Sequence, residues 1–351
     1  MKQMKNNSIL SQDFAQVVHD YDFSEVKGNS VLVTGSTGLL GSQLVLFMDY
    51  LNQTKNYGIK IYALCRSEEK AKRVFSDVFE RIHCVIGDVL NLPAFEDSID
   101  YVIHGASITA SKEFIDHAVE TIDIAVNGTL NMLRFAKSKN VKSFVYLSSM
   151  EAFGVTDGKS EVHEEDLGYI DISSPRSSYM ESKRMCENLC ACFASEYAFD
   201  VKSVRLAQTL GAGIDYNDTR VAAYFARCVM EKTDIILKTA GNTKRPILYS
   251  ADAISAIITV LLKGKKGNVY TAANPATFKT IRETAEMIVE KIAHNAIKLT
   301  FDIKEVPAEY APNLNLNLNL NVDKLCSLGW KPVVGLQEAY ERLLSGMRES
   351  K

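Results

Sequence analysis

The sequence predicts an α/β protein in which a doubly wound parallel sheet is followed by a smaller α/β lobe toward the C-terminal end. Two patterns support this fold class. Short apolar runs alternate with helical periodicities over residues 1–206, which is the rhythm of parallel strands joined by crossover helices. Beyond residue 207 the rhythm loosens, as expected where a second lobe begins.

The first domain, residues 1–206, starts with an expected amphipathic helix whose role is to cover an edge of the core. Ser11 is its candidate N-cap, and its apolar positions are Ile9, Leu10, Phe14, Val17 and Val18. Strands are predicted over residues 30–33, 60–64, 82–86, 101–104, 143–147 and 202–205. Helices are predicted over residues 42–51, 121–139 and 179–197.

The second domain, residues 207–351, is predicted to be mostly a substrate lobe, with about 237–272 returning to the first domain. Helices are expected over residues 218–230, 251–262, 281–292 and 336–347, and strands over residues 234–238 and 268–272. The last of these strands is expected to rejoin the main sheet.

Asn and Leu alternate strictly over residues 313–321. This period of two predicts an extended segment with its leucines on one face, although asparagine is a poor strand former. A surface segment with docked leucines is favoured over a loop near the substrate.

The composition is that of a globular protein with an ordinary surface. The chain has 351 residues, of which 46% are hydrophobic and 24% charged, enough for one large core or two modest ones. The net charge of −3 gives no reason to expect a nucleic-acid partner. No apolar run reaches the roughly 18 residues of a membrane span, and residues 1–30 carry no signal-peptide pattern. We therefore expect no membrane partner.

The seven cysteines, an odd number, favour a reducing, cytoplasmic location. Cys186, Cys190 and Cys192 lie close together, but their spacing fits no zinc pattern and no histidine is near. We expect thiols packed on a helix and no metal site.

A glycine-spaced turn follows the first predicted strand, with Gly35, Gly38 and Gly41 three residues apart. A dinucleotide diphosphate must approach the backbone closely at such a turn, where a Cβ would block it and a helix N-terminus offers free N–H groups. The strand before and the helix after favour this dinucleotide-binding (Rossmann) interpretation over a tight turn alone. The cofactor contacts expected here are Gly35, Thr37, Gly38, Leu39, Leu40 and Gly41.

Arg66, at the end of the second predicted strand, bears on the choice of dinucleotide. An acidic residue near this point would bind the adenosine ribose of NAD, and none is present. A guanidinium matches a 2′-phosphate, so NADP is favoured within a general NAD(P) prediction; the alternative is a solvated arginine. Asp88 can receive the adenine amino group or cap a local turn. Val89 and Ala106 are the other predicted cofactor contacts.

Tyr179 and Lys183 are spaced i, i+4, so they share one face of a predicted helix. A nearby ammonium lowers the pKa of a phenol, and such a tyrosine can exchange a proton with an alcohol while a hydride moves to or from nicotinamide. Ser149 lies at the C-terminal end of the fifth predicted strand, the edge at which doubly wound sheets bind ligands. Its hydroxyl can hold the reacting oxygen.

These motifs, in this order, resemble the extended short-chain dehydrogenase/reductase family over nearly the whole chain. Within it, the likeness is to NAD(P)-dependent nucleotide-sugar epimerases and dehydratases, and also to UDP-glucuronate decarboxylases. The resemblance rests on Thr34-Gly35-x-x-Gly38-x-x-Gly41, Asp88, Ser149, Ala152-Phe153-Gly154, Tyr179-x-x-x-Lys183 and Leu328-Gly329-Trp330-Lys331-Pro332.

The resemblance implies that Tyr179 is the acid/base, that Lys183 lowers its pKa and binds the nicotinamide ribose, and that Ser149 orients the sugar hydroxyl. Such enzymes oxidise C4 of the sugar to a ketone, and the hydride usually returns, so the cofactor is recycled. The partner implied is a nucleotide-diphosphate sugar. A homodimer is also implied, packed through the helices near 121–139 and 179–197.

Substrate contacts are expected from Ser107, Gln208, Arg220 and Arg245. Both arginines can bind phosphate in a bidentate manner, and the alternative for either is a surface arginine. Gln208 stands where the family often has asparagine, and so does Ala125.

Glu151 matches the base of dehydratases, and decarboxylases also carry a glutamate there, so it favours elimination or decarboxylation over simple epimerisation. Its alternative is a carboxylate held by nearby N–H groups. Met150 departs from the acid found in many dehydratases and from the serine found in others, which leaves the exact reaction open. Two other functions remain: an NADPH-dependent reductase of a keto-sugar or other carbonyl compound, and a non-catalytic dinucleotide sensor.

Overall fold

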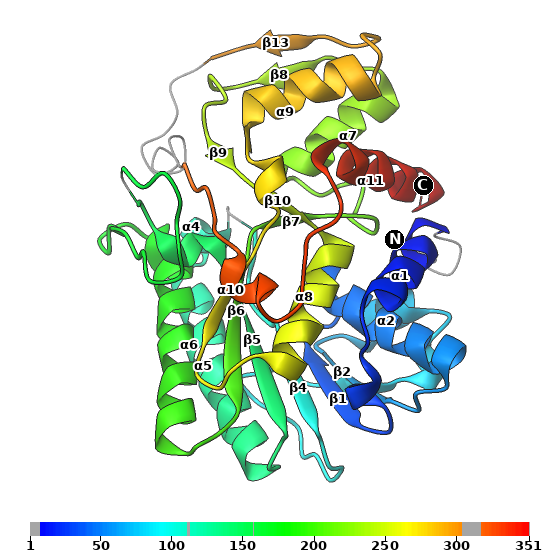
Figure 1. The fold of residues 1–351 in the computed structure, drawn as a ribbon, viewed down its shortest axis with the longest axis vertical. Coiled ribbons are helices and arrows are strands. Elements are labelled where there is room, and N and C mark those ends of the chain that lie inside the picture. Colours follow the sequence, from blue (N-terminus) through cyan, green and yellow to red (C-terminus); the bar gives the residue numbers. More distant parts are fainter. Residues whose placement is uncertain (1–7, 111–112, 157, 304–316, 351) are drawn as a thin grey trace.

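Seven parallel strands form the central sheet of the computed structural model, which describes residues 8–110, 113–156, 158–303 and 317–350 (Figure 1). The strand order is β11-β6-β5-β4-β1-β2-β3. The chain therefore begins in the middle of the sheet, runs outward to β3, and crosses back to β4. The bounds are β1 (Ser30–Thr34), β2 (Lys60–Cys65), β3 (His83–Ile86), β4 (Tyr101–His104), β5 (Ser143–Ser149), β6 (Val201–Leu206) and β11 (Val269–Ala272).

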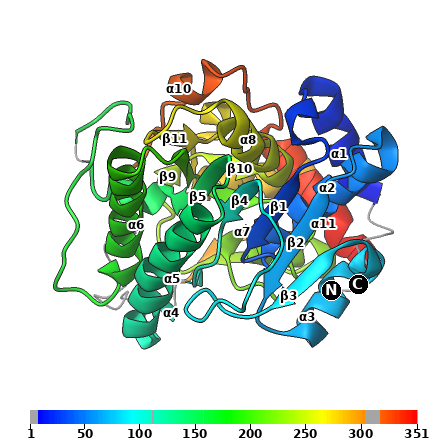
Figure 2. The same cartoon turned by 90° about the horizontal axis from the view of Figure 1, so that it is seen from below.

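Helices cover both faces of this sheet (Figure 2). Alternate residues of β1 explain why: Val31 and Val33 belong to one apolar core, and Leu32 belongs to the other. The first core packs against α1 (Ser8–Asp20), α2 (Leu39–Lys55) and α8 (Ser250–Lys263). The second packs against α5 (Ala118–Ser138) and α6 (Ser177–Glu196).

A smaller lobe lies beyond the C-terminal ends of the central strands, at the top of Figure 1. It is held by three two-stranded pairs. These are β7 (Gln208–Leu210) with β10 (Ile247–Tyr249), β9 (Lys244–Arg245) with β12 (Lys279–Thr280), and β8 (Ile235–Leu237) with β13 (Leu299–Phe301). Its helices are α7 (Val221–Glu231), α9 (Ile281–Met287) with a π-helical continuation (Ile288–Ile292), and α11 (Leu336–Ser350).

Short helices connect these parts: η2 (Ser24–Val26), α3 (Glu68–Phe75), η3 (Phe79–Arg81), α4 (Glu113–Asp116), η4 (Met150–Phe153), η5 (Pro275–Thr277) and α10 (Asp323–Cys326). Among the described residues, no helix is long and apolar enough to cross a membrane.

The fold class and the strands of the central sheet are confirmed, and β11 rejoins the sheet beside β6 as expected. Several predicted helix starts are wrong: α2 begins at Leu39 and α5 at Ala118, each three residues before the predicted start. Ser11 is not an N-cap, because the chain is already helical from Ser8, the first described residue, whose backbone N–H donates to the Glu349 carboxylate of α11 at 2.9 Å. The helix expected from Asp218 begins at Val221, because the Asp218 carboxylate accepts the Arg220 N–H in a local turn.

The alternating Asn/Leu segment is described from Asn317 onward, and residues 313–316 lie outside the described residues. Leu318 and Leu320 are 1% and 0% exposed, which confirms the docked leucines for this part of the segment. Asn317 pairs with Lys244 of β9, and Leu320 pairs with Val162 in the loop after β5. The segment therefore ties β9 to that loop.

Trp330 anchors the chain that leads into α11. Its side chain is fully buried, and its indole N–H donates to the Asp252 carbonyl at 3.1 Å and to the Ser255 hydroxyl at 3.0 Å. We expect Trp330→Ala to lower the free energy of unfolding by about 3–5 kcal/mol, because it leaves a large cavity and unpaired acceptors. Chemical denaturation would measure this, with Trp330→Phe as a milder control that removes chiefly the N–H. Equal losses for both variants would contradict a dominant packing role.

Candidate active site and cofactor-binding edge

The glycine turn lies at the C-terminal end of β1, where it leads into α2. Gly35 has φ +66°, and a Cβ there would lie 2.6 Å from the Gly105 carbonyl oxygen. A Cβ on Gly41 would lie 2.2 Å from the Gly35 carbonyl oxygen. Gly38 is exposed, and a Cβ there would meet only that same oxygen, at 3.2 Å. The protein's own packing thus requires Gly35 and Gly41, whereas Gly38, at the start of α2, is exposed and less tightly constrained.

A buried network of polar side chains supports this edge of the sheet. The Thr34 hydroxyl accepts the N–H groups of Gly105 and Ala106, both at 3.2 Å, and lies 2.7 Å from Nδ1 of His104. Nε2 of His104 lies 3.1 Å from the Thr129 hydroxyl on α5. Burial, reinforced by the charge of Lys183, lowers the pKa of His104 to about 3. A neutral His104 therefore ties the end of β1 to the end of β4, a link that the sequence analysis missed.

The other predicted cofactor residues lie along the same edge. Arg66 is exposed at the end of β2, and Thr37, Leu39, Leu40 and Ala106 are partly buried. Asp88 is half-buried, and its Oδ1 accepts the Leu90 N–H at 2.8 Å, so the local turn cap that the sequence left open is present. Val89 beside it is buried.

Tyr179, Lys183 and Ser149 lie where β5 ends and α6 begins. Tyr179 is 7% exposed, and its ring stacks on that of Phe114 with centroids 4.2 Å apart. Nζ of Lys183 donates to the Leu147 carbonyl at 2.8 Å and lies 5.4 Å from the centroid of the Tyr179 ring. The Ser149 hydroxyl accepts the Glu151 N–H at 3.2 Å. The fold thus gathers these side chains at the edge where a ligand of a parallel sheet binds.

Burial dominates the protonation of this cluster. It raises the pKa of Tyr179, and the negative charge of Glu151 adds to the effect. A hydrogen bond with Ser149 and the charges of Arg176 and Arg220 oppose it. Burial lowers the pKa of Lys183 to about 8. The sequence argument expected the ammonium to lower the pKa of the phenol; in the protein alone the net direction is upward, because both groups are removed from water.

Glu151 forms an ion pair with Arg176, with Nη2 and Oε2 2.7 Å apart. The Arg176 side chain is 3% exposed, and its guanidinium carbon lies 4.8 Å from the centroid of the Phe114 ring. The sequence analysis missed Arg176 and Phe114. The i, i+3 spacing from Arg176 to Tyr179 was an available signal for the first, whereas Phe114 comes from the distant helix α4 and had none.

The predicted substrate arginines also approach this cluster. Arg220 is partly exposed and pairs with Asp218 at 2.6 Å, and its charge acts on Tyr179. Arg245 lies on β9. Burial lowers its pKa, and the negative charge of Glu151 is the main effect that opposes this shift. Gln208 on β7 is partly buried, and the Ser107 hydroxyl donates to the Ile108 carbonyl at 3.1 Å.

Two buried N–H groups at this site have no acceptor among the described residues: Nη1 of Arg176 and Nε of Arg245. Buried donors in native proteins are normally paired, so unpaired ones mark a position where a ligand oxygen fits. Within the same described part of the chain, no cluster of three or more histidine, cysteine or acidic residues forms a candidate metal site. On α6, Cys186 and Cys190 are buried as expected, but Cys192 is exposed.

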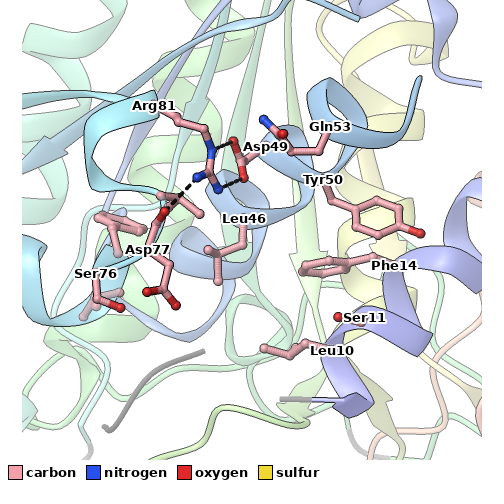
Figure 3. A pocket seen from close by; sticks show the side chains of 13 residues that line it. Leu10, Ser11, Phe14, Leu46, Asp49, Tyr50, Gln53, Ser76, Asp77 and Arg81 are labelled. Carbon is pink, nitrogen blue, oxygen red and sulfur yellow. Dashed lines mark hydrogen bonds and ion pairs between the residues drawn. The ribbon is translucent and has the colours of Figure 1, made fainter. Parts of the chain in front are cut away.

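A separate pocket lies between α1, α2 and the segment from Val74 to Arg81 (Figure 3). Its walls are largely apolar, and at its rim Nε and Nη2 of Arg81 donate to the Asp49 carboxylate at 2.8 and 2.6 Å. None of the predicted site residues lines it, so it is not the candidate active site.

A family model described as the NAD dependent epimerase/dehydratase family matches residues 31–273, from β1 to just past β11. UDP-glucuronic acid decarboxylase 1 of Danio rerio is 25% identical over 327 residues, covering 92% of this chain and 73% of that protein. UDP-glucuronic acid decarboxylase 6 of Arabidopsis thaliana is 26% identical over 315 residues, covering 88% of this chain and 85% of that protein.

Solved structures share the fold over most of their length. An epimerase from Methanothermobacter thermautotrophicus superimposes with a TM-score of 0.79 at 21% identity, covering 98% of this chain and 96% of that one. UDP-glucose 4-epimerase from Thermotoga maritima, solved with UDP-glucose, gives 0.75 at 19% identity, covering 91% and 99%. RMD from Pseudomonas aeruginosa, solved with NADPH, gives 0.71 at 21% identity, covering 92% and 100%.

The buried His104 predicts a specific loss of stability in acid. Its pKa is below the ordinary 6.5 in the folded state, so acid protonates the unfolded chain first. The stability from neutral His104 is complete above pH 6.5 and is lost progressively as the pH falls toward 3. In His104→Gln, we expect lower stability at neutral pH but a shallower acid dependence, by up to about 1.4 kcal/mol per pH unit. Urea unfolding at several pH values would test this, and parallel curves for the two proteins would refute it.

Proposed function

This chain belongs to the NAD dependent epimerase/dehydratase family, and from that premise we propose that it converts a nucleotide-diphosphate sugar through a transient 4-keto sugar. The observation that carries the proposal is the gathering of Ser149, Tyr179 and Lys183 at the sheet edge beside the glycine turn. The unpaired buried N–H groups of Arg176 and Arg245 support an anionic substrate at the same place.

The exposed Gly38, at the start of α2, fits the diphosphate of a dinucleotide. When bound, an oxidised nicotinamide supplies the acceptor for the hydride on C4 of the sugar. Tyr179, as the phenolate, accepts the proton of the C4 hydroxyl, so the loss of one hydride and one proton leaves a ketone. Ser149 donates a hydrogen bond to the reacting oxygen, and the positive charge of Lys183 stabilises the phenolate.

Glu151 is the proposed base for the step after the ketone forms. A ketone acidifies the neighbouring C–H bond, and a carboxylate can accept that proton. Met150 is buried and carries no proton to donate to a leaving hydroxyl. Glu151 is the reason that we favour elimination or decarboxylation over simple epimerisation; because of Met150, an elimination would need another residue as the proton donor. A hydride that returns to the sugar would make the enzyme a lyase or an isomerase with a recycled cofactor.

Arg220, Arg245, Gln208 and Ser107 are the proposed contacts for the nucleotide diphosphate and the sugar. Arg66 favours NADP, and Asp88, Val89 and Ala106 are the proposed contacts along the rest of the cofactor. One neighbouring structure was solved with NAD and another with NADPH, so the fold suits both.

We further propose a cytoplasmic homodimer packed through α5 and α6. Val119, Ile122 and Met185 are exposed apolar residues on these helices, which suits a helix-to-helix interface. Within each subunit, residues 1–206 and about 237–272 form the proposed dinucleotide domain, and the rest of 207–351 forms the substrate lobe.

An NADPH-dependent carbonyl reductase is the second candidate, favoured by the exposed Arg66 at the end of β2. Mass spectrometry of ligands released from the purified protein would identify the cofactor and a trapped nucleotide sugar together. Turnover of a nucleotide sugar without net cofactor consumption supports the first function. Stoichiometric consumption of NADPH supports the reductase instead.

Tyr179→Phe is expected to lower turnover by about 10²–10⁴-fold, because the ring remains but cannot exchange a proton. Bound cofactor should be retained, since the stack on Phe114 needs only the ring. Product formation by chromatography and cofactor content by absorbance would be measured on the same sample. Wild-type turnover in this variant would eliminate the proposed acid/base role.

Gly38→Ala and Gly41→Ala form a matched pair that tests the cofactor edge. A Cβ at Gly38 would lie 3.2 Å from the Gly35 carbonyl oxygen, a contact that a small shift can relieve, so we expect a folded variant that binds dinucleotide at least about tenfold more weakly. A Cβ at Gly41 collides with backbone, so we expect loss of stability itself. Calorimetric titration with NAD and NADP, after a thermal scan, would distinguish the two. Unchanged affinity in Gly38→Ala would place the diphosphate elsewhere.

A further inference from the structure

Arg176 is a charged residue whose unpaired Nη1 supports an anionic substrate, but its other contacts have no role in the proposed chemistry. It immediately precedes α6, and its guanidinium is buried against the candidate site. A buried guanidinium is costly to desolvate, so its position needs compensation by specific contacts. Two such contacts exist, and they lead to the two different groups proposed to carry protons.

The first contact is the ion pair with Glu151. Nη2 of Arg176 donates to Oε2 at 2.7 Å, and the Glu151 side chain is only 22% exposed. A charge-assisted hydrogen bond of this length restricts the rotamers of the glutamate. Glu151 follows Ser149 by two residues, so orienting this carboxylate also orients it relative to the end of β5.

The second contact runs through Phe114. The Arg176 guanidinium lies 4.8 Å from the centroid of this ring, which in turn stacks on the Tyr179 ring at 4.2 Å and an interplanar angle of 10°. The Ser178 hydroxyl donates to the Phe114 carbonyl at 3.0 Å, so α4 is fastened to the start of α6. Phe114 is 1% exposed and has little freedom to move.

We propose that Arg176 is a positioning residue that orients the Glu151 carboxylate and, through Phe114, the Tyr179 ring, so that one guanidinium couples the two proton-transfer groups. This inference rests on the proposed function, because it assigns proton transfer to both partners. Neither the ion pair nor the ring stack depends on which nucleotide sugar is bound.

The charges around Tyr179 support this coupling. Glu151 raises the pKa of the phenol, whereas Arg176 and Arg220 lower it together with the Ser149 hydrogen bond; Lys183 lies on the same helix face. When Glu151 accepts a proton from the substrate, its charge is neutralised and the charge of Arg176 acts on Tyr179 unopposed. The second proton transfer thereby favours the phenolate form of Tyr179.

The test measures the hydride step alone as a function of pH. Wild type, Glu151→Gln, Arg176→Met and the double variant would be loaded with oxidised cofactor and mixed with UDP-glucose, UDP-glucuronate or dTDP-glucose. Formation of reduced nicotinamide would be followed by absorbance in a single turnover. The acid limb of this rate reports the loss of the Tyr179 proton.

We expect the acid limb to move in opposite directions in the two single variants. Glu151→Gln removes the negative charge and should shift it by about one unit to lower pH, and Arg176→Met should shift it by about one unit to higher pH. The double variant should return near wild type, and Arg176→Lys should restore part of the shift. A limb that moves in the same direction in both single variants, or that does not move in Arg176→Met, would overturn the proposal.

Arg184→Met is the matched control. Arg184 lies on the same helix and supports the same loop through backbone acceptors, with Nε donating to Ala152 and Nη2 to Phe153 and Gly168. Within the described part of the chain, its side-chain hydrogen bonds and ion pair involve neither Glu151 nor Phe114, so its loss should lower the melting temperature without moving the acid limb. If Arg184→Met shifted the acid limb as much as Arg176→Met does, the role of Arg176 would be only to support the loop.

A double-mutant cycle measured by thermal unfolding tests the contact between Arg176 and Glu151 without substrate. Arg176→Met and Glu151→Gln should each lower the melting temperature, and the double variant should lower it by less than the sum, because each single variant strands a buried partner. Additive shifts would contradict the positioning role. If wild type reduces no cofactor with any of the three sugars, the proposed function itself fails, whereas a failure confined to Arg176→Met removes only this inference.

Discussion

The hydrogen bond between Thr34 and His104 holds together the two strand ends on which the cofactor edge depends. β1 and β4 are the strands at which the chain reverses its direction of winding, so no crossover helix joins them directly. Doubly wound sheets open at this position, and the opening must still have a fixed width to hold a ligand. The Thr34 hydroxyl reinforces the ladder between these strands by binding both the imidazole and the two N–H groups after β4. Gly35 packs closely against Gly105 just beyond these strand ends.

A second constraint is the excess of buried positive charge next to the catalytic cluster. Lys183, Arg176 and Arg245 are withdrawn from water; Glu151 is the carboxylate that acts on the two arginines, and Glu187 is the one that acts on Lys183. Such an arrangement costs free energy in the protein alone, and an anion recovers it on binding. The raised pKa of Tyr179 belongs to the same balance, because the phenolate is stable only when positive charge outweighs burial. The proposed anionic substrate would offset this cost.

The sequence predicted the elements whose signals are local. The period-two runs, the glycine spacing and the Tyr179–Lys183 pair each depend on residues near one another in the chain, so the sheet and its edge were predictable. Contacts between distant segments were not. Phe114 stacks on Tyr179 although the two are 65 positions apart, and no local pattern relates them. Ser8 is bound by a glutamate of α11 in the same way. The sequence also failed to predict that the pKa of Tyr179 is raised. Lys183 is visible four residues away in the sequence, whereas the burial that raises this pKa depends on the whole fold.

The contact between Ser8 and Glu349 links positions 341 residues apart, so α1 and α11 lie side by side although they are far apart in the sequence. Phe14 of α1 packs against Phe47, and Asp13 of the same helix binds Tyr249 and Arg342. An undocked α11 would leave the buried Asp13 carboxylate without its arginine, so we expect α1 and α11 to detach from the fold together.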